Sequence, residues 1–353
     1  MAHFKRNAVV EVDLNTISQN VSALQAQFNS SVKHLAVVKA DAYGHGADAV
    51  AKRIAPQVDW FAVNDVEEGI ALRHQNIRQP ILVFEPPEAG IVNSYSRYNL
   101  TATVSDTHHF QMLPADTSYH INFDTGMGRL GFKVDQMEEV KTLREKHSYL
   151  HCTGLYSHFA TADELKSTKV EEQYQLFKKI RSHFESDLIA HLCNTGGTVQ
   201  CPKGHFDMVR TGIGIYGFAP GETEIPKLKP AMRWKTHFVQ LKQVKKGETA
   251  SYGARWSCPE DGWLGILPVG FSDGLPRRLS GQLDVRINGK SYPVVGIVTM
   301  NYCMVYVKER PPVDTMVYLL DEQCTAAHWA QKLGTIPYEI ITRISKKIPR
   351  VHK

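Results

Sequence analysis

The feature that most constrains the fold is an alternation of short apolar runs and helical segments over the first two thirds of the 353-residue chain. Each run has the length and composition of a buried strand, and a segment with helical character follows it. Strands that alternate with helices predict parallel pairing through right-handed crossovers. The eight runs are residues 35–39, 60–64, 81–85, 100–105, 119–124, 151–159, 189–194 and 207–217.

Eight strand–helix units predict an α/β fold in the form of a closed (β/α)8 barrel of the TIM type. A doubly wound open sheet is the alternative, but no G-x-G-x-x-G motif follows the first strand, which weakens it. One helix has a clear start signal. Asp65 is expected to be its N-cap, with Glu68 three residues later as in a capping box.

The composition changes near residue 231, where helical periodicity gives way to short β-type runs punctuated by glycine and proline. We therefore expect two domains, a barrel over residues 1–230 and a mostly β domain over residues 231–353. One helix is expected near the end, at residues 326–334. Residues 8–12 read as a strand that precedes the first barrel helix, so they are a candidate to pair with the second domain.

Composition argues against several classes of protein. No run of eighteen apolar residues is present, and the first residues lack the apolar core of a signal peptide, so a cytoplasmic protein without a membrane segment is expected. The net charge of +5 is mild, and the basic residues do not form the dense stripe of a nucleic-acid-binding surface. The six cysteines form no C-x-x-C pair, which argues against a metal site and against a disulfide scaffold.

Lys39 follows the first strand of the predicted barrel, in the stretch HLAVVKADAYGHGA. Functional side chains of such barrels lie at the carboxyl ends of the strands. Partial burial at that place disfavours the ammonium form, so the amine becomes available as a nucleophile or base. Taken alone, a lysine that simply reaches solvent is the simpler interpretation.

Later strands also end in polar, glycine-rich loops. Arg129 lies in NFDTGMGRLGF after the fifth strand, and His158 lies in YSHFATADE after the sixth. CNTGG and VRTGIGIYG follow strands seven and eight, where barrels often bind phosphate, because glycines let backbone N–H groups approach the oxygens. A lysine anchor, a phosphate cradle and a nearby arginine together indicate pyridoxal 5'-phosphate.

With these loops the sequence resembles the alanine racemase family, which belongs to the fold-type III pyridoxal-phosphate enzymes. The resemblance covers nearly the whole chain, in the right order. It implies an amino-acid racemase, an isomerase that supplies D-alanine as a peptidoglycan precursor, and a homodimer with shared active sites. The segments that carry it are AVVKADAYGHG, DTGMGRLG, SHFATAD, VRTGIGIYG, SYG, PVGFSDG and YEIITRI.

The resemblance also implies a role for each site residue. Lys39 would form the internal Schiff base with the cofactor, and Tyr252 of a partner subunit would be the opposing base. Arg210 would face the pyridine nitrogen, steadied by His158. Arg129 would reach the phenolic oxygen of the cofactor and the substrate carboxylate. The other expected contacts are the Met300 N–H with that carboxylate across the dimer, and Tyr43, Asn194, Thr195, Gly212, Ile213 and Tyr338 with the cofactor, mainly its phosphate.

Three positions depart from the commonest pattern of the family. Asn122 stands where many members have a lysine that becomes carbamylated, so a small anion such as chloride is expected beside Arg129. Asn301 replaces an aspartate and Phe271 a tyrosine, which leaves open a serine racemase or one of broad specificity.

Two further alternatives are a fold-type III decarboxylase and a cofactor-carrier barrel. The decarboxylase would bring an acidic residue for a diamine and its own cysteine, and no such block is seen. The carrier would lack the second domain, which the residues after 230 are long enough to form.

Overall fold

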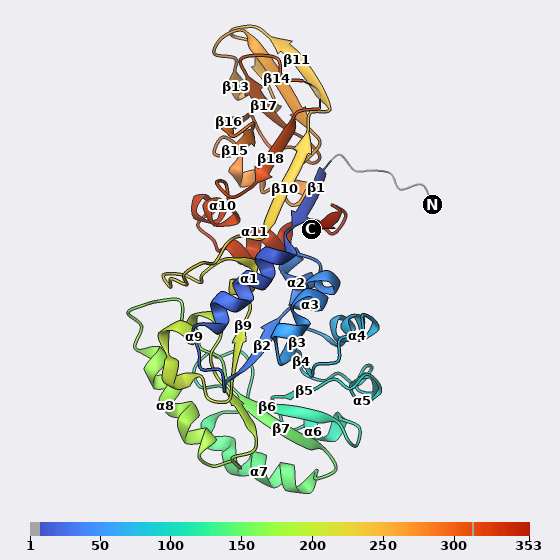
Figure 1. The fold of residues 1–353 in the computed structure, drawn as a ribbon, viewed down its shortest axis with the longest axis vertical. Helices are drawn as coiled ribbons and strands as arrows, with labels where there is room; N and C mark the ends of the chain where they lie inside the picture. The colour runs from blue at the N-terminus through green and yellow to red at the C-terminus, as the bar shows by residue number, and fades with distance from the viewer. Residues whose placement is uncertain (1–7, 313) are drawn as a thin grey trace. The chain divides into compact units, whose positions relative to one another are not determined.

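The computed structural model describes residues 8–312 and 314–353, which divide into two units (Figure 1). One unit contains residues 16–229 and the other contains residues 8–15 and 230–353. Residues 8–12 were the expected candidate to pair with the second domain, and the structure confirms it: β1 (Ala8–Val12) pairs antiparallel with β10 (Met232–His237) and parallel with β19 (Arg350–His352). The first residues therefore belong to the second unit and not to the barrel. No helix in the described residues has the length and apolar character that crossing a membrane requires.

Residues 16–229 form the predicted (β/α)8 barrel. Two four-stranded parallel sheets, β4-β3-β2-β9 and β5-β6-β7-β8, make up the ring. The Val83 N–H donates to the Thr101 carbonyl at 2.9 Å where β4 meets β5, and the Arg210 N–H donates to the Cys193 carbonyl at 2.9 Å where β8 meets β9. The strands are β2 (Lys33–Val37), β3 (Trp60–Val63), β4 (Ile81–Val83), β5 (Ala102–Val104), β6 (Ser118–Asn122), β7 (His151–Tyr156), β8 (Ile189–His191) and β9 (Met208–Thr211).

Helices surround the barrel strands (Figure 1). β3, β4 and β5 are buried at every position, which explains why these strands read as continuous apolar runs. The α-helices are α1 (Leu14–Gln25), α2 (Lys39–Gly44), α3 (Ala47–Ile54), α4 (Val66–His74), α5 (Asn93–Arg97), α6 (His109–Met112), α7 (Met137–Lys146), α8 (Lys169–Arg181) and α9 (Thr195–Gln200). The 3-10 helices are η1 (Ala55–Gln57), η2 (Val134–Gln136), η3 (Pro202–Gly204) and η4 (Ile213–Tyr216).

The second unit is built on a nine-stranded sheet in the order β11-β14-β17-β16-β15-β18-β10-β1-β19, with a two-stranded sheet of β12 and β13 beside it. Buried and less buried residues alternate along β10 and β17, as expected when one face of a strand packs on a core. The remaining strands are β11 (Gln240–Val244), β12 (Thr249–Ala250), β13 (Trp256–Ser257), β14 (Gly262–Leu267), β15 (Asp284–Ile287), β16 (Lys290–Val295), β17 (Cys303–Val307) and β18 (Met316–Leu320). Its 3-10 helices are η5 (Tyr252–Ala254), η6 (Phe271–Asp273) and η7 (Arg277–Leu279).

The end of the chain contains two helices where the sequence predicted one. α10 (Ala326–Leu333) lies at the expected place, and α11 (Pro337–Arg343) follows it. Pro337 occupies the first turn of α11, where its missing N–H has no intrahelical partner to lose. Sequence reasoning missed α11 because the helix is short and its buried residues, Ile340 and Ile341, are β-branched.

Glu11 on β1 joins two lysines that are distant in the sequence. Its carboxylate is buried and lies 2.5 Å from the Lys235 Nζ and 2.6 Å from the Lys353 Nζ. Burial alone would raise the pKa of this carboxyl. The hydrogen bonds and charges of the two lysines outweigh burial, so the pKa lies below its ordinary value of 4.5.

We expect Glu11→Gln to lower the free energy of unfolding of the second unit by about 1 to 2 kcal/mol at neutral pH, because two charge-assisted hydrogen bonds are lost. Since the pKa of Glu11 is lowered by folding, its contribution is complete above the unfolded pKa and is lost as the pH falls through the folded value. Denaturant unfolding of parent and variant at neutral pH and at about pH 3 measures this. A difference of the same size at both pH values would contradict it.

Glu322 offers a matched control, because it pairs with Arg233 on the surface of the same unit. Exposed ion pairs contribute little, so Glu322→Gln should change the free energy of unfolding by less than about 0.5 kcal/mol.

Candidate active site

Lys39 lies at the carboxyl end of the first barrel strand, where α2 begins directly after β2 and Val38. Its side chain is half-buried, and the Nζ lies 5.8 Å from the centroid of the Phe84 ring. Burial lowers the pKa of the amine, the Arg129 guanidinium lowers it further, and the Glu68 carboxylate opposes both. The neutral amine, which acts as nucleophile or base, therefore forms more readily than in an ordinary lysine.

The turn that follows Lys39 has an unusual backbone. Residues 40–43 have φ between 50° and 55° and ψ between 39° and 52°, in the left-handed region. This conformation costs an L-residue about 1 to 2 kcal/mol. Hydrogen bonds from the Ala42 N–H to the Val38 carbonyl at 2.8 Å and from the Gly46 N–H to the Asp41 carbonyl at 3.0 Å help to hold the turn.

Tyr43, Thr195 and Gly212 meet at one place on the barrel. The Thr195 Oγ1 accepts a hydrogen bond from the Gly212 N–H at 2.9 Å. A Cβ atom on Gly212 would lie 2.6 Å from the Tyr43 hydroxyl, so any side chain here would displace the tyrosine. Ile213 begins η4 beside them, and Asn194 caps α9, which begins at Thr195. A space kept clear by a glycine and lined by hydroxyl groups fits a phosphate.

Arg210 on β9 is buried and held on several sides. Its guanidinium donates to the Nδ1 atoms of His191 at 3.0 Å and His158 at 3.2 Å. It also donates to the backbone carbonyls of His191 at 3.0 Å, Ser157 at 2.8 Å and Leu192 at 3.2 Å. Burial lowers the pKa of Arg210 to about 10, which leaves the group charged at neutral pH.

The histidines beside Arg210 are neutral. Burial, and then the charge of Arg210, lower the pKa values of His158 and His191 well below the usual value. Each accepts the arginine on Nδ1, which assigns the proton to Nε2. The His191 Nε2 then donates to the Nδ1 of His120 at 2.8 Å, and burial lowers the pKa of His120 to about 3. Sequence reasoning placed only His158 beside Arg210 and missed His191 and His120, because both lie inside apolar strands.

Arg129 lies in the exposed loop that follows β6. The Asp124 Oδ1 shapes this loop by accepting two of its backbone N–H groups, at 2.9 and 3.0 Å. Gly131 has φ of 117°, and a Cβ there would lie 2.7 Å from the backbone, so glycine is required. The charge of Arg129 lowers the pKa of Lys39. The uncharged Asn122 is the last residue of β6, the strand that precedes the loop of Arg129.

The barrel unit thus contains nine of the predicted site residues, and contacts or electrostatic interactions link most of them. His158 connects these residues, because its Nδ1 accepts a hydrogen bond from Arg210 and its pKa responds to Arg129 and Lys39. The other three predicted residues, Tyr252, Met300 and Tyr338, belong to the second unit. Of these, Tyr338 is half-buried in α11 and accepts a hydrogen bond on its carbonyl from the Thr342 hydroxyl at 2.7 Å.

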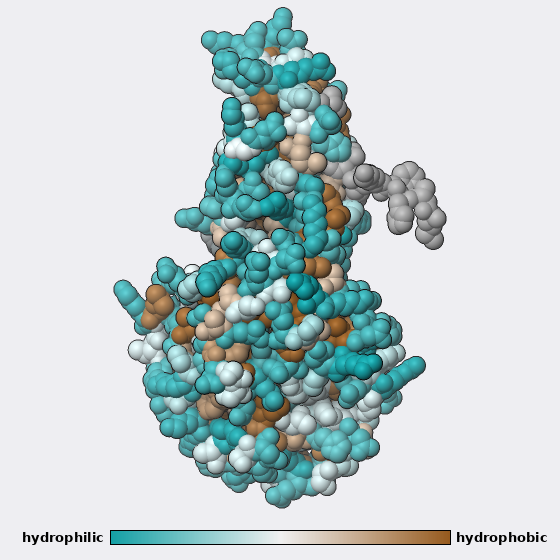
Figure 2. Space-filling view, in the orientation of Figure 1, coloured by the Kyte–Doolittle hydropathy of each residue, from teal (hydrophilic) through white to brown (hydrophobic). Residues whose placement is uncertain are grey.

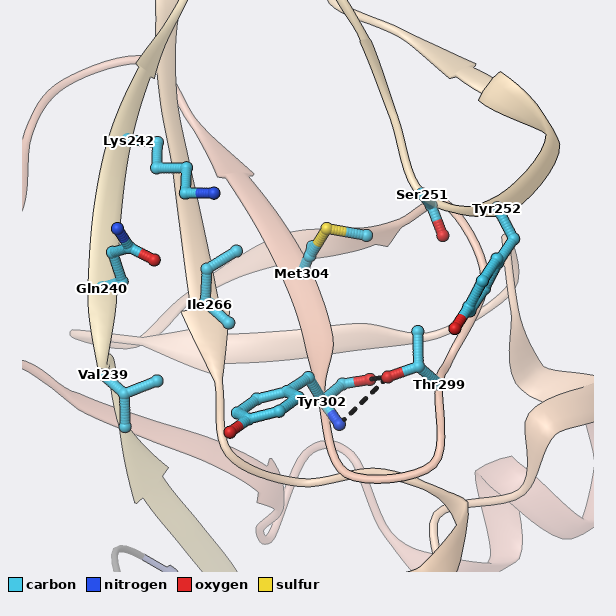
Figure 3. A pocket seen from close by; sticks show the side chains of 9 residues that line it. All are labelled: Val239, Gln240, Lys242, Ser251, Tyr252, Ile266, Thr299, Tyr302 and Met304. Atoms are coloured by element: carbon cyan, nitrogen blue, oxygen red, sulfur yellow. Dashed lines mark hydrogen bonds between the residues drawn. The ribbon is translucent and has the colours of Figure 1, made fainter.

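Tyr252 begins η5 and is 71% exposed. The preceding Ser251 has φ of 73° and ψ of 176°, a conformation normally restricted to glycine. Its Oγ accepts the Ile297 N–H at 2.9 Å and donates to the Ile297 carbonyl at 3.2 Å, which fixes the start of the loop. Tyr252 lines a pocket of about 710 Å³ together with Val239, Gln240, Lys242, Ser251, Ile266, Thr299, Tyr302 and Met304 (Figure 3).

Met300 lies beside this pocket and is 59% exposed. Its carbonyl accepts the Ser272 N–H at 2.9 Å, and the Ser272 hydroxyl accepts a hydrogen bond from the Asn301 Nδ2 at 2.9 Å. The Thr299 hydroxyl accepts the Tyr302 N–H at 3.2 Å and donates to the Tyr302 carbonyl at 2.8 Å (Figure 3). These bonds fix the loop that presents the Met300 N–H.

The part of the second unit around Tyr252 exposes several large apolar side chains. Most of the surface of each unit that Figure 2 draws is hydrophilic. Exposed apolar clusters on such a background mark sites of protein contact. The exposed apolar residues in or beside the pocket are Val239, Tyr252, Phe271, Met300 and Tyr302.

Two family models match the chain. The model of the alanine racemase N-terminal domain matches residues 12–220, and that of the alanine racemase C-terminal domain matches residues 231–352. The chain belongs to the alanine racemase family. The curated alanine racemase 1 of Bacillus subtilis (strain 168) is 34% identical to it, over 99% of this chain and 93% of the relative. The alanine racemase of Geobacillus stearothermophilus is 35% identical, over 99% and 95%.

Solved structures of the alanine racemase family are similar over the same length. The alanine racemase of Clostridium difficile 630 superposes with a TM-score of 0.93 at 30% identity, covering 99% of this chain and 96% of that one. The alanine racemase of Bacillus anthracis, solved with bound L-Ala-P, has a TM-score of 0.93 at 34% identity, covering 100% and 96%.

The barrel of this alanine racemase family member fits pyridoxal phosphate, the cofactor that the sequence resemblance implies. A cofactor with an aldehyde, a phosphate and a ring nitrogen needs an amine, an anion cradle and a donor for the ring. Lys39 would provide the amine, the space that Gly212 keeps clear suits the phosphate, and the buried guanidinium of Arg210 would suit the ring nitrogen. The residues present therefore agree with the expected cofactor.

Proposed function

We propose that the protein is a pyridoxal-phosphate-dependent racemase that interconverts L- and D-alanine. The observation that carries the proposal is the half-buried amine of Lys39 at a strand end, in a chain that matches the alanine racemase family along its length. The relatives named alanine racemase support alanine as the substrate. Supply of D-alanine for the cell wall, in the cytoplasm, is part of the same proposal.

Lys39 and Tyr252 are proposed as the two catalytic groups. Pyridoxal phosphate, when bound, supplies an aldehyde for an amine and a conjugated ring that acidifies the α-hydrogen of an amino acid. Because the pKa of Lys39 is lowered, its amine gives up a proton more readily than an ordinary lysine and can exchange one on one side of the α-carbon. Tyr252 of a partner subunit exchanges a proton on the opposite side. Removal on one side and return on the other inverts the configuration.

The remaining residues bind and orient. Arg210 keeps its proton, because its pKa stays well above neutral, and two neutral histidines and three carbonyls hold it in one orientation. Arg129 and the Met300 N–H bind the substrate carboxylate. Tyr43, Asn194, Thr195, Gly212, Ile213 and Tyr338 hold the cofactor, mainly through its phosphate.

The proposed assembly is a homodimer with shared active sites. The exposed apolar cluster around Tyr252 and Met300 supports a protein contact at this part of the second unit. A second copy of the chain is the proposed partner, and two-fold symmetry would give two identical sites.

The test of this function uses the purified protein with added pyridoxal phosphate. We expect a visible absorption band, and borohydride reduction should label the peptide that contains Lys39. L-Alanine should lose its optical activity without release of carbon dioxide. A colourless protein that refuses the cofactor would overturn the proposal, carbon dioxide release would indicate a decarboxylase, and equal rates with serine would indicate broad specificity.

The uncharged Asn122 leads to a prediction about anions. Its neutral side chain supplies no negative charge near Arg129, so a small anion such as chloride is proposed to fill that role. Replacing chloride by gluconate at constant ionic strength should raise the KM for alanine by up to about fivefold, the equivalent of a partly exposed ion pair. In Asn122→Asp, which supplies the charge itself, steady-state kinetics should show no chloride dependence. An unchanged KM in the parent without chloride would contradict the prediction.

A further inference from the structure

We propose that Glu68 is a positioning residue for Lys39: its carboxylate holds the left-handed turn that follows the lysine, and so aims the amine. The inference rests on the proposed function, because it concerns how the chain prepares Lys39 for the cofactor. It adds a residue outside the predicted site, on the neighbouring helix α4.

The hydrogen bonds of Glu68 join two strand ends. Its Oε2 accepts the N–H of Asn64, directly after β3, at 2.9 Å, and its Oε1 accepts the N–H of Asp41, in the turn after β2, at 3.3 Å. The N–H of Ala40 also donates to this carboxylate. One side chain therefore connects the ends of neighbouring barrel strands at the point where Lys39 leaves the first of them.

This arrangement corrects an expectation from the sequence. The Asp65 carboxylate accepts the Glu68 N–H at 2.9 Å, so the predicted N-cap of α4 is present. The capping box predicted that the Glu68 side chain would turn back to the N–H of Asp65. Its hydrogen bonds go instead to Asn64 and to the turn beside Lys39.

The turn needs such support, because its four left-handed residues are strained. Backbone strain of this kind persists only when surrounding groups hold it. Successive N–H groups in a turn can point to one side and form a concave site for an anion, and the N–H groups of residues 40 and 41 share the Glu68 carboxylate in this way. Without the carboxylate, the turn is free to relax and the direction of the Lys39 side chain changes with it.

The charge of Glu68 has a second effect on the same lysine. Burial raises the pKa of Glu68, and the N–H of Asn64 opposes this, in keeping with a carboxylate drawn out of water to a specific place. The charged groups that act on Lys39 are Arg129, which lowers its pKa, and Glu68, which raises it. Glu68 thus balances part of the positive charge at the barrel mouth.

The experiment measures the affinity of the apoprotein for pyridoxal phosphate by absorbance titration. Glu68→Ala should weaken binding by about tenfold or more, because it removes all the hydrogen bonds to the turn. Glu68→Gln should have an intermediate effect, since an amide oxygen accepts but its NH2 group cannot. Glu67→Gln is the matched control, an exposed glutamate one residue earlier on the same helix, and should stay within about twofold of the parent.

A rescue variant separates positioning from general support of the fold. Glycine adopts the left-handed conformation without steric cost, so Ala40→Gly should recover most of the affinity lost in Glu68→Ala and change the parent by less than about twofold. If Glu68 merely stabilised α4, a change in the turn would not restore cofactor binding. Should Glu68→Ala fail to fold, as judged by thermal unfolding, Glu68→Gln with and without Ala40→Gly decides the question.

The outcomes distinguish this inference from the proposed function. A parent protein that does not bind pyridoxal phosphate would overturn the proposed function. A parent that binds it, with Glu68 variants that match Glu67→Gln or that Ala40→Gly does not rescue, would overturn the role of Glu68 alone. Weakened binding that Ala40→Gly restores would establish Glu68 as a positioning residue.

Discussion

Replacing Lys39 by alanine should abolish racemisation, lowering kcat/KM for alanine by about 10,000-fold or more. The expected loss is large because one amine is assigned two tasks, covalent attachment of the cofactor and proton exchange at the α-carbon. Steady-state kinetics measures the loss, and borohydride labelling shows whether attachment has also disappeared.

Lys33 provides the control for this substitution. It is exposed at the amino end of the same strand, so Lys33→Ala should leave kcat/KM within about twofold of the parent. A Lys39→Ala protein that keeps more than about a hundredth of the activity would contradict the assignment. Labelling of a different lysine would contradict it independently of any kinetics.

Tyr252→Phe is expected to slow racemisation by about 100- to 10,000-fold while leaving cofactor binding intact, because it removes only the phenol proposed to exchange the second proton. Lys39 remains able to exchange a proton on its own side. The variant should therefore still incorporate solvent deuterium into one enantiomer of alanine without inverting it, which mass spectrometry and chiral chromatography together detect.

Tyr302→Phe is the matched control for Tyr252→Phe. It removes a phenol oxygen from the same pocket and should change the rate by less than about threefold. A Tyr252→Phe protein that interconverts the enantiomers as fast as the parent would remove the second catalytic group from the mechanism.

The two variants together test the shared active site. In the proposed homodimer, co-expressing Lys39→Ala and Tyr252→Phe chains would give mixed dimers in which one site lacks both groups and the other has both. If half of the dimers are mixed, about a quarter of the parent activity should return. No recovery in isolated mixed dimers would show that each site takes both residues from one chain.

The sequence was most informative where periodicity or position alone determines structure. Eight apolar runs predicted eight parallel strands, because a strand of continuous apolar residues is expected to be buried on both faces. The barrel then places Lys39 at the carboxyl end of the first strand. The resemblance to the alanine racemase family then named residues in the second unit, such as Tyr252, that no local pattern identifies.

Features that depend on tertiary contacts could not be predicted in this way. Sequence gave no sign of the left-handed turn at residues 40–43, because no glycine occupies those positions and hydrogen bonds from elsewhere hold them. Glu68 matched a local capping pattern, yet its carboxylate accepts a hydrogen bond from the Asp41 N–H in the neighbouring turn. His191 and His120 lie in apolar strands. Their hydrogen bonds depend on the buried guanidinium of Arg210, which donates to His191, and His191 donates in turn to His120.

The pairing of Arg210 with neutral imidazoles makes the charge of this cluster insensitive to moderate changes in the pH of the solution. A protonated ring could not accept from the guanidinium, but His158 and His191 take up protons only under conditions far more acidic than neutral. The formal charge on this trio is therefore constant through moderate acidification. Over that interval, variation of the reaction rate with pH should therefore not come from Arg210, His158 or His191.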